Sequence, residues 1–247
     1  MPFHDHFSAH AGGYAAHRPS YPPELVDYLV GLAPRAGLAW DAGCGSGQLS
    51  TLLAERFDRV IATDPSAEQL ARAPAHPRIE YREATAEHGG LADASVDLAV
   101  AAQAAHWFDL AAYFREVHRV TATDAAIALI SYGGTRITPE LDPIVEGFRV
   151  DELEAFWPPQ RIHVEDGYRS LPFPFRETRA PSFEIRLEWT LDDLLAYMRT
   201  WSALRSLEPA DAAALLEDLR ERLAPGWGAD EVVRTVAWPL SLRVGYV

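Results

Sequence analysis

The chain has 247 residues, of which 48% are hydrophobic, and this is enough for one large α/β domain with an accessory part. Its formal net charge of −14 argues against a general nucleic-acid binder, because such a protein needs a basic face toward the phosphates. All 22 basic residues other than histidine are arginine, so chemistry that requires a lysine, such as a Schiff base, is excluded.

Cysteine content and hydropathy indicate the compartment. The single cysteine, Cys44, excludes an intrachain disulfide and fits a reducing environment. The first residues do not show a basic segment followed by an apolar one, so no secretory signal is predicted. No apolar run approaches the roughly 18 residues of a membrane span. We therefore expect a cytoplasmic protein with no membrane partner.

Residues 1–36 precede the first predicted strand. Ser20 can cap a helix that has Pro22 or Pro23 in its first turn. Histidines near the start have loosely metal-like spacing, but no cysteine or acidic cluster accompanies them, and no metal site is predicted. These histidines are His4, His6, His10 and His17.

A glycine-rich stretch follows. The apolar run 38–41 ends in an acid, Gly43, Gly45 and Gly47 alternate after it, and a helical pattern begins at Gln48. This order predicts a strand, a tight turn and a helix. Alternating glycines allow a sharp turn and leave no Cβ between the main chain and a ligand, and the helix offers unpaired N–H groups at its start. We predict a binding loop for a small molecule with a polar, close-fitting part.

The glycine spacing is not that of a dinucleotide loop. It reads GxGxG from Gly43, and Gln48 stands where the third glycine of GxGxxG belongs. Asp64 ends the second predicted strand, 59–64, about twenty residues beyond the loop, where an acid can accept hydrogen bonds from both hydroxyls of a ribose. Asp64 therefore indicates a nucleoside without identifying the ligand. The alternative is that it caps the following helix ahead of Ser66.

Three further strands are predicted, at 78–83, 97–102 and 125–132, with a helix at 110–120. Helical crossovers between five strands predict a parallel, doubly wound α/β sheet. Because ligands bind at the carboxyl edge of such sheets, the side chains after the fourth strand are expected beside the glycine loop. These are Gln103, His106 and Trp107.

The chain departs from the bare fold after residue 134. The stretches 157–161 and 168–175 are irregular, aromatic and arginine-bearing, which is typical of a substrate lid. A strand is predicted at 183–189, and the closing segment 232–247 is expected to be an antiparallel last strand with a bulge or break at Pro239. The whole sheet would then have seven strands.

We expect a single domain with four parts. They are an N-terminal lid segment (1–36), a core (37–134), a lid insertion (135–181) and C-terminal strands and helices that complete the sheet (182–247).

Three motifs resemble a known family. The run Asp-Ala-Gly-Cys-Gly-Ser-Gly at 41–47 resembles the first motif of class I S-adenosylmethionine (SAM) dependent methyltransferases. The Ser-Val-Asp-Leu run at 95–98, with Gln-Ala-x-His-Trp-Phe-Asp at 103–109, is similar to type 11 methyltransferase domains of trans-aconitate-methyltransferase-like bacterial and fungal proteins. So is the tyrosine before Arg-Pro-x-Tyr-Pro at 18–22. The resemblance implies SAM as donor, S-adenosylhomocysteine as product and a small-molecule acceptor.

The resemblance also implies site residues. Arg18 is expected near the methionine carboxylate, and Thr85 stands where the family usually carries an acid for the adenine amine. The implied donor contacts are Tyr14, Arg18, Asp41, Gly43, Gly45, Gly47, Asp64, Pro65, Thr85, Ala86 and Gln103. The acceptor is expected near Trp107, Tyr132, Trp157, Arg161 and Arg169.

Methyl transfer mainly requires that the two partners are aligned and water is excluded. His106 is the candidate base if the acceptor is an un-ionised hydroxyl or amine. If the acceptor is a carboxylate, Arg161 or Arg169 could anchor it and no base is needed. The sequence leaves this choice open.

Two other functions remain as alternatives. A nicotinamide-dependent oxidoreductase is disfavoured by the GxGxG spacing and by the absence of a Tyr-x-x-x-Lys pair. A non-catalytic SAM-fold regulator is disfavoured by the intact Gly43, Gly45, Asp64 and Gln103. The protein is expected to be a monomer or a homodimer.

Overall fold

The computed structural model describes residues 19–247, so Tyr14 and Arg18 lie outside the described residues. Eight strands in this part of the chain form a sheet with the order β3-β2-β1-β4-β5-β8-β6, and β7 pairs with β8 beside that path. The strands are β1 (Leu38–Ala42), β2 (Arg59–Asp64), β3 (Ile79–Glu83), β4 (Val96–Ala102), β5 (Thr121–Tyr132), β6 (Arg176–Thr178), β7 (Glu184–Trp189) and β8 (Arg234–Tyr246).

The helices connect these strands. Those around the sheet are α1 (Pro23–Leu32), α2 (Gln48–Ala54), α3 (Ala67–Leu70) and α4 (Leu110–Val120), with the short 3₁₀ turns η2 (Ala86–His88) and η3 (Ala105–Trp107). After β5 come α5 (Asp142–Gly147), a π-helical turn η4 (Phe148–Glu152), η5 (Glu154–Phe156), α6 (Arg161–Glu165), α7 (Leu191–Met198), α8 (Ser202–Arg205) and α9 (Pro209–Trp227).

The predicted α/β fold is confirmed. Strands β1 to β5 are parallel, and β8 runs antiparallel to β5. The sheet has one strand more than expected, because the three residues of β6 pair with β8 at the edge. No helix within residues 19–247 combines the length and the apolar character needed to cross a bilayer.

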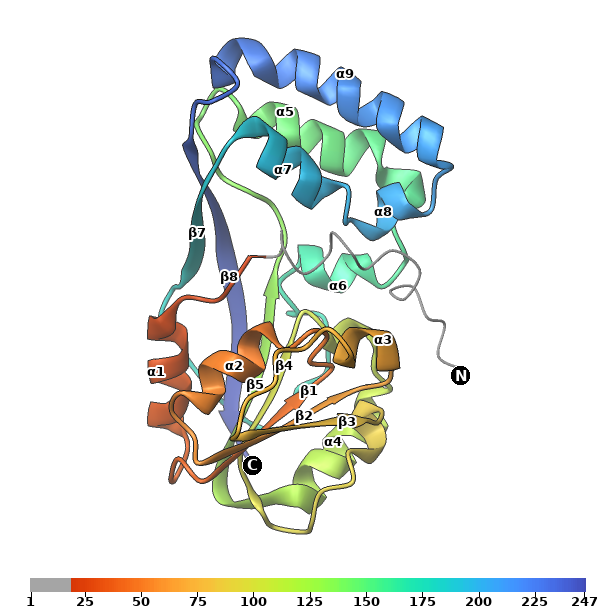
Figure 1. Cartoon of the computed structure of the whole chain (residues 1–247). Coiled ribbons are helices and arrows are strands. Elements are labelled where there is room, and N and C mark those ends of the chain that lie inside the picture. The colour runs from red at the N-terminus through yellow and green to blue at the C-terminus, as the bar shows by residue number, and fades with distance from the viewer. Residues whose placement is uncertain (1–18) are drawn as a thin grey trace.

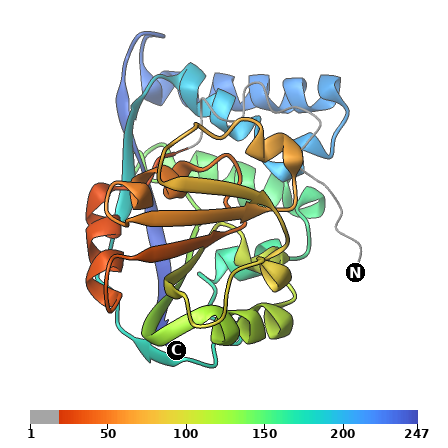
Figure 2. The same cartoon turned by 60° about the horizontal axis from the view of Figure 1, so that its bottom comes forward.

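Successive side chains of a strand point to opposite faces of the sheet, so the apolar residues form a core on each face. In β4, Leu98 and Val100 pack on the side of α1 and α2, whereas Ala99 and Ala101 pack on the side of α4. Figure 2 shows α4 lying under the strands. The apolar face of α4 is buried, and its members are Tyr113, Phe114, Val117 and Val120. Helices on both faces give the doubly wound arrangement.

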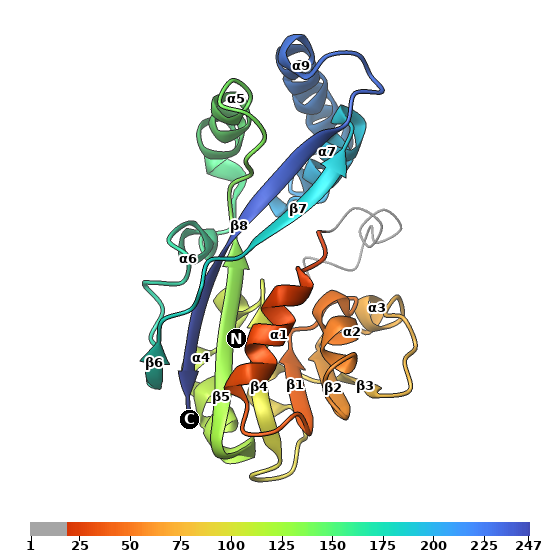
Figure 3. The ribbon, with the colours of Figure 1, turned by 90° about the vertical axis from the view of Figure 1, so that its left-hand side faces the viewer.

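A second layer of helices stands beyond the carboxyl end of β5. Figure 1 shows α5, α7, α8 and α9 in this layer, and Figure 3 shows that β7 and β8 extend from the sheet toward it. Helix α9 contacts α5, α7 and α8. Helix α7 begins with a reciprocal capping box between Thr190 and Asp193. Helix α6 lies between this layer and the sheet, so it faces the edge where the glycine loop is found.

Strand β8 corrects one expectation. The bulge or break expected at Pro239 is not observed, and the strand is continuous. Residues 234–239 pair with β7, and residues 240–246 pair with β5. Pro239 stands where the partner strand changes, so its missing N–H is tolerated without a bulge.

Candidate functional site

A cavity of about 820 Å³ opens at the carboxyl edge of β1, β2 and β4. The glycine loop forms one wall, η3 forms another, and Gln160 reaches it from the lid. Many of the predicted site residues line it. They are Asp41, Gly43, Gly45, Asp64, Pro65, Thr85, Ala86, Gln103, His106, Trp107 and Tyr132.

The glycine loop turns tightly against β2. The N–H groups of Gly43 and Cys44 both donate to the carbonyl of Thr63, at 2.8 and 3.0 Å. Gly43 has φ of +70°, and a Cβ there would lie 2.5 Å from the Cβ of Ala104. Gly45 also has a positive φ, of +56°, but a Cβ there would meet no atom within 4 Å. Gly43 is therefore needed for packing, whereas Gly45 keeps the loop open toward the cavity.

Gly47, an expected donor contact, stands at the start of α2. It does not line the cavity, and it is the N-cap residue of α2, with φ of +83°. A Cβ at Gly47 would lie 2.5 Å from the hydroxyl of Tyr81. Glycine is required here by the left-handed backbone and by the close approach of β3.

Asp41 is a buried carboxylate at the end of β1. The residue is 1% exposed, and its Oδ2 accepts a hydrogen bond of 2.6 Å from the hydroxyl of Ser50. Its Oδ1 has no hydrogen-bond partner among the described residues. Burial raises the pKa of Asp41 to about 7, the Ser50 hydroxyl opposes this, and the nearby charge of Asp64 raises it further. The site thus holds an acceptor that a donor or a cation would stabilise.

Asp64 links β2 to the glycine loop. Its Oδ2 accepts from the N–H of Gly45 at 2.8 Å, and its Oδ1 accepts from the N–H of Ser66 at 2.9 Å. The N-cap of α3 is Ser66, whose hydroxyl accepts from the N–H of Gln69, so the capping alternative for Asp64 is wrong. The two backbone donors fix the carboxylate at the edge of the cavity.

Gln103 follows β4 in a strained conformation. Its φ is +54°, which is uncommon for a residue with a Cβ. Its Nε2 donates to the carbonyl of Tyr132 at 2.7 Å, while its Oε1 is buried without a partner among the described residues. A second buried acceptor therefore lies on this wall.

His106 lies on η3 and lines the cavity. Its Nδ1 is 2.8 Å from the hydroxyl of Tyr168, and its ring centroid is 4.8 Å from that of Trp107. Tyr168 comes from the lid insertion and is fully buried. Its contact with His106 was not predicted, because no local pattern links residues that are 62 positions apart.

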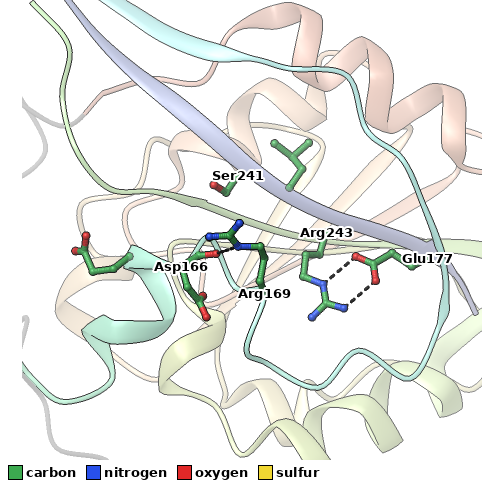
Figure 4. Close-up of a pocket in the computed structure, with 8 residues that line it drawn as sticks. Asp166, Arg169, Glu177, Ser241 and Arg243 are labelled. Carbon is green, nitrogen blue, oxygen red and sulfur yellow. Dashed lines mark hydrogen bonds and ion pairs between the residues drawn. The ribbon is translucent and has the colours of Figure 1, made fainter.

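Three of the residues expected near the acceptor do not line the cavity. Trp157 donates through Nε1 to the carbonyl of Arg149, and the Arg161 guanidinium stacks on the Trp157 ring while its Nε bonds to Glu165. Arg169 borders a separate surface hollow of about 410 Å³, where its Nε donates to a backbone carbonyl of the same turn (Figure 4). The expected carboxylate anchor is therefore not found among the described residues.

Some cavity residues were missed. Tyr21 and Asp109 lie within the motifs that carry the family resemblance, so they could have been proposed. Gln69 on α3 and Gln160 before α6 carry no local signal, because only the tertiary arrangement brings them to the cavity.

The profile of the family described as "Methyltransferase domain" matches residues 40–129, from β1 into β5. A candidate methyltransferase of Dictyostelium discoideum is 31% identical over 225 residues, which cover 90% of this chain and 86% of that protein. An uncharacterised methyltransferase of Mycobacterium tuberculosis is 42% identical over 171 residues, which cover 64% of this chain and 69% of that protein.

Solved structures agree with these relatives. A candidate type II methyltransferase from Anaeromyxobacter dehalogenans is 46% identical and superposes with a TM-score of 0.87, covering 93% of this chain and 97% of its own. A candidate methyltransferase from Anabaena variabilis shares the fold, with a TM-score of 0.54 at 20% identity, and covers 87% of this chain and 96% of its own. The predicted resemblance is confirmed, and the chain belongs to the methyltransferase family.

Proposed function

We propose that the protein transfers a methyl group from SAM to a small-molecule acceptor. The observation that carries the proposal is the position of Gly45, where a Cβ would meet no protein atom within 4 Å, in a cavity that the carboxylates Asp41 and Asp64 also line. A loop without a side chain at this point lets a ligand approach the main chain closely. A nearby carboxylate pair favours a ligand with a positive charge and with hydroxyl donors.

The chemistry of SAM fits the groups that the cavity offers. Asp41 Oδ1 and Gln103 Oε1 are buried acceptors without partners among the described residues, and such atoms are costly unless a donor reaches them. The amine of SAM is a cationic donor and its sulfonium is a second positive charge. A cation beside Asp41 would favour its ionised form and so offset the effect of burial.

The nucleoside end is assigned to the β2 side of the cavity. Each oxygen of a carboxylate can accept more than one hydrogen bond, so Asp64 can hold ribose hydroxyls while it also binds the N–H groups of Gly45 and Ser66. Thr85 and Ala86 follow β3, the strand next to β2, and line the same cavity, so they would face the adenine. Thr85 can offer a hydroxyl where the family usually has a carboxylate.

The protein's part in the reaction is alignment and the exclusion of water. Bound SAM supplies a methyl group that its sulfonium already activates for displacement. The aromatic side chains of Trp107, Tyr132 and Tyr21 line the cavity and would shape the acceptor site. His106 lines the cavity and would contact the acceptor, whereas no described arginine lines it.

Asp64→Ala is expected to weaken SAM binding by roughly 1.5–3 kcal/mol, the usual contribution of hydrogen bonds to a charged group. Isothermal titration calorimetry of both proteins measures the difference directly. Asp58→Ala is the matched control, because Asp58 is an exposed acid that precedes β2 and lies outside the cavity. An unchanged SAM affinity in the Asp64 variant would remove this residue from the binding site.

Methyl transfer itself is tested with methyl-labelled SAM and a panel of phenols, amines and carboxylic acids. The proposal expects label to move from SAM to at least one class of acceptor in proportion to enzyme. NADH is included as a competitor, because its binding with micromolar affinity in place of SAM would favour the oxidoreductase alternative. Binding of SAM without transfer to any acceptor would favour the regulator alternative.

A further inference from the structure

Tyr168 reaches His106 from the lid side of the cavity wall. His106 lines the cavity, whereas Tyr168 does not and is completely buried. The Tyr168 hydroxyl lies 2.8 Å from His106 Nδ1, and the two rings are 5.9 Å apart between centroids. The buried tyrosine hydroxyl therefore contacts Nδ1, and Nε2 is the second nitrogen of the His106 ring.

The backbone that presents Tyr168 is strained. Tyr168 has φ of +64°, and Gly167 before it has φ of +66°. A left-handed conformation costs a residue with a Cβ roughly 1–2 kcal/mol, so such a residue persists only where the surroundings fix it. Non-glycine residues held in this way cluster at functional sites.

Strand β8 supplies the contacts that fix this turn. Arg243 donates through Nη1 to the carbonyls of Tyr168 and Leu171, at 3.1 and 2.6 Å, and it binds both oxygens of Glu177 (Figure 4). The N–H of Tyr168 donates to the carbonyl of His163 at 2.7 Å. A Cβ at Gly167 would lie 2.6 Å from the hydroxyl oxygen of Ser241, so the turn is also pressed against β8. These contacts therefore hold residues 167 and 168 in their left-handed conformation.

The surroundings of the hydroxyl decide where its proton points. Burial raises the pKa of Tyr168 above its usual range, and the nearby backbone N–H groups of His106 and Ala105 offset this only in part. The hydroxyl therefore stays protonated at neutral pH. Its own proton needs an acceptor, and His106 Nδ1 lies at hydrogen-bond distance.

We propose that Tyr168 is a positioning residue that donates its hydroxyl proton to His106 Nδ1 and so holds the ring as the Nε2–H tautomer. The bond on one ring nitrogen sets the protonation of the other. In this state Nε2 donates a hydrogen bond and cannot take a proton. His106 would then donate a hydrogen bond that orients the acceptor. Because His106 could not remove a proton, the attacking atom of the acceptor would have to arrive without one. This role in methyl transfer rests on the proposed function, whereas the tautomer does not.

The experiment is ¹⁵N nuclear magnetic resonance of the histidine rings in the full chain. The His106 signals are assigned from their loss in His106→Gln. We expect an unprotonated Nδ1 that carries the upfield shift of a hydrogen-bond acceptor, and a protonated Nε2. In Tyr168→Phe, which keeps the ring and removes the hydroxyl, Nδ1 should move downfield toward the position of a nitrogen that accepts no hydrogen bond.

Tyr113→Phe is the matched control. Tyr113 is also fully buried, but its hydroxyl has no partner among the described residues, so its loss should leave the His106 signals unchanged. A protonated Nδ1 in the wild type, or the same His106 spectrum in Tyr168→Phe, would overturn the proposal. Titration with S-adenosylhomocysteine separates the two claims, because absent binding contradicts the proposed function while the spectrum still reports on Tyr168.

Discussion

Gly45→Val is expected to reduce the affinity for SAM and S-adenosylhomocysteine by more than about 100-fold while the protein remains folded. The reason is that the valine side chain would occupy space that the loop leaves open on the cavity side, where a Cβ meets no protein atom within 4 Å. Because φ at Gly45 is +56°, the substitution also adds strain of roughly 1–2 kcal/mol to the folded state. Calorimetric titration and thermal unfolding measure the two effects separately.

Gly90→Val is the control for the strain. Gly90 has φ of +68° and an open environment, with only the end of the Arg82 side chain near a Cβ, and it does not line the cavity. This variant should lose a similar amount of stability and keep its affinity for both ligands. Retained SAM binding in Gly45→Val, or an equal loss in Gly90→Val, would contradict the assignment of the glycine loop as the binding loop.

Asp41→Asn is expected to stabilise the ligand-free protein and to weaken SAM binding. The pKa of Asp41 is raised from 3.8 to about 7 in the folded state, mainly by burial, so ionisation of Asp41 opposes folding. At 1.36 kcal/mol per pKa unit, the amide should add roughly 2–4 kcal/mol to the free energy of unfolding at pH 8. The same change removes the negative charge that a cationic ligand requires.

The raised pKa of Asp41 also predicts how the stability difference between Asp41→Asn and the wild type changes with pH. Below about pH 4 the carboxyl is protonated in both the folded and the unfolded states, so the variant and the wild type should have the same stability. As the pH rises to about 7, the unfolded state loses its proton first and the wild type loses stability relative to the variant. Above pH 7 the difference stays constant. Urea unfolding at several pH values measures this curve.

Asp58→Asn serves as the control here, because Asp58 is exposed and lies outside the cavity. It should change neither the stability curve nor SAM binding. An Asp41→Asn protein that is less stable than the wild type at pH 8 would show that the carboxylate is needed for the fold. A stable variant that still binds SAM with wild-type affinity would remove Asp41 from the ligand site.

The part of the site that was predicted from sequence depends on local constraints. Gly43, Gly45 and Gly47 all have positive φ, a conformation that glycine adopts without strain and that the alternating glycines indicated. Asp41 and Asp64 end neighbouring parallel strands, and the carboxyl ends of such strands meet at one edge. Apart from Gly47, which caps α2, these residues line the cavity, so strand ends and turn geometry were enough to assign them to it without a structure.

The lid could not be predicted in this way. Arg161 was expected at the acceptor because arginine binds carboxylates, but it bonds to Glu165, which also pairs with the buried Arg149. Arg149 in turn pairs with Glu146. Any exposed arginine in an irregular segment gives the same local signal, and only the packing of α5, η4 and α6 decides which carboxylate it meets. Tyr168 was missed for the same reason.

The central claim is that the cavity at the glycine loop is a SAM site, and calorimetric titration with SAM, S-adenosylhomocysteine and NADH tests it most directly. The account predicts that SAM and S-adenosylhomocysteine each bind saturably with a stoichiometry of one per chain and compete for the same site. It predicts no binding heat from NADH. Saturable binding of NADH without binding of SAM or S-adenosylhomocysteine would contradict the account.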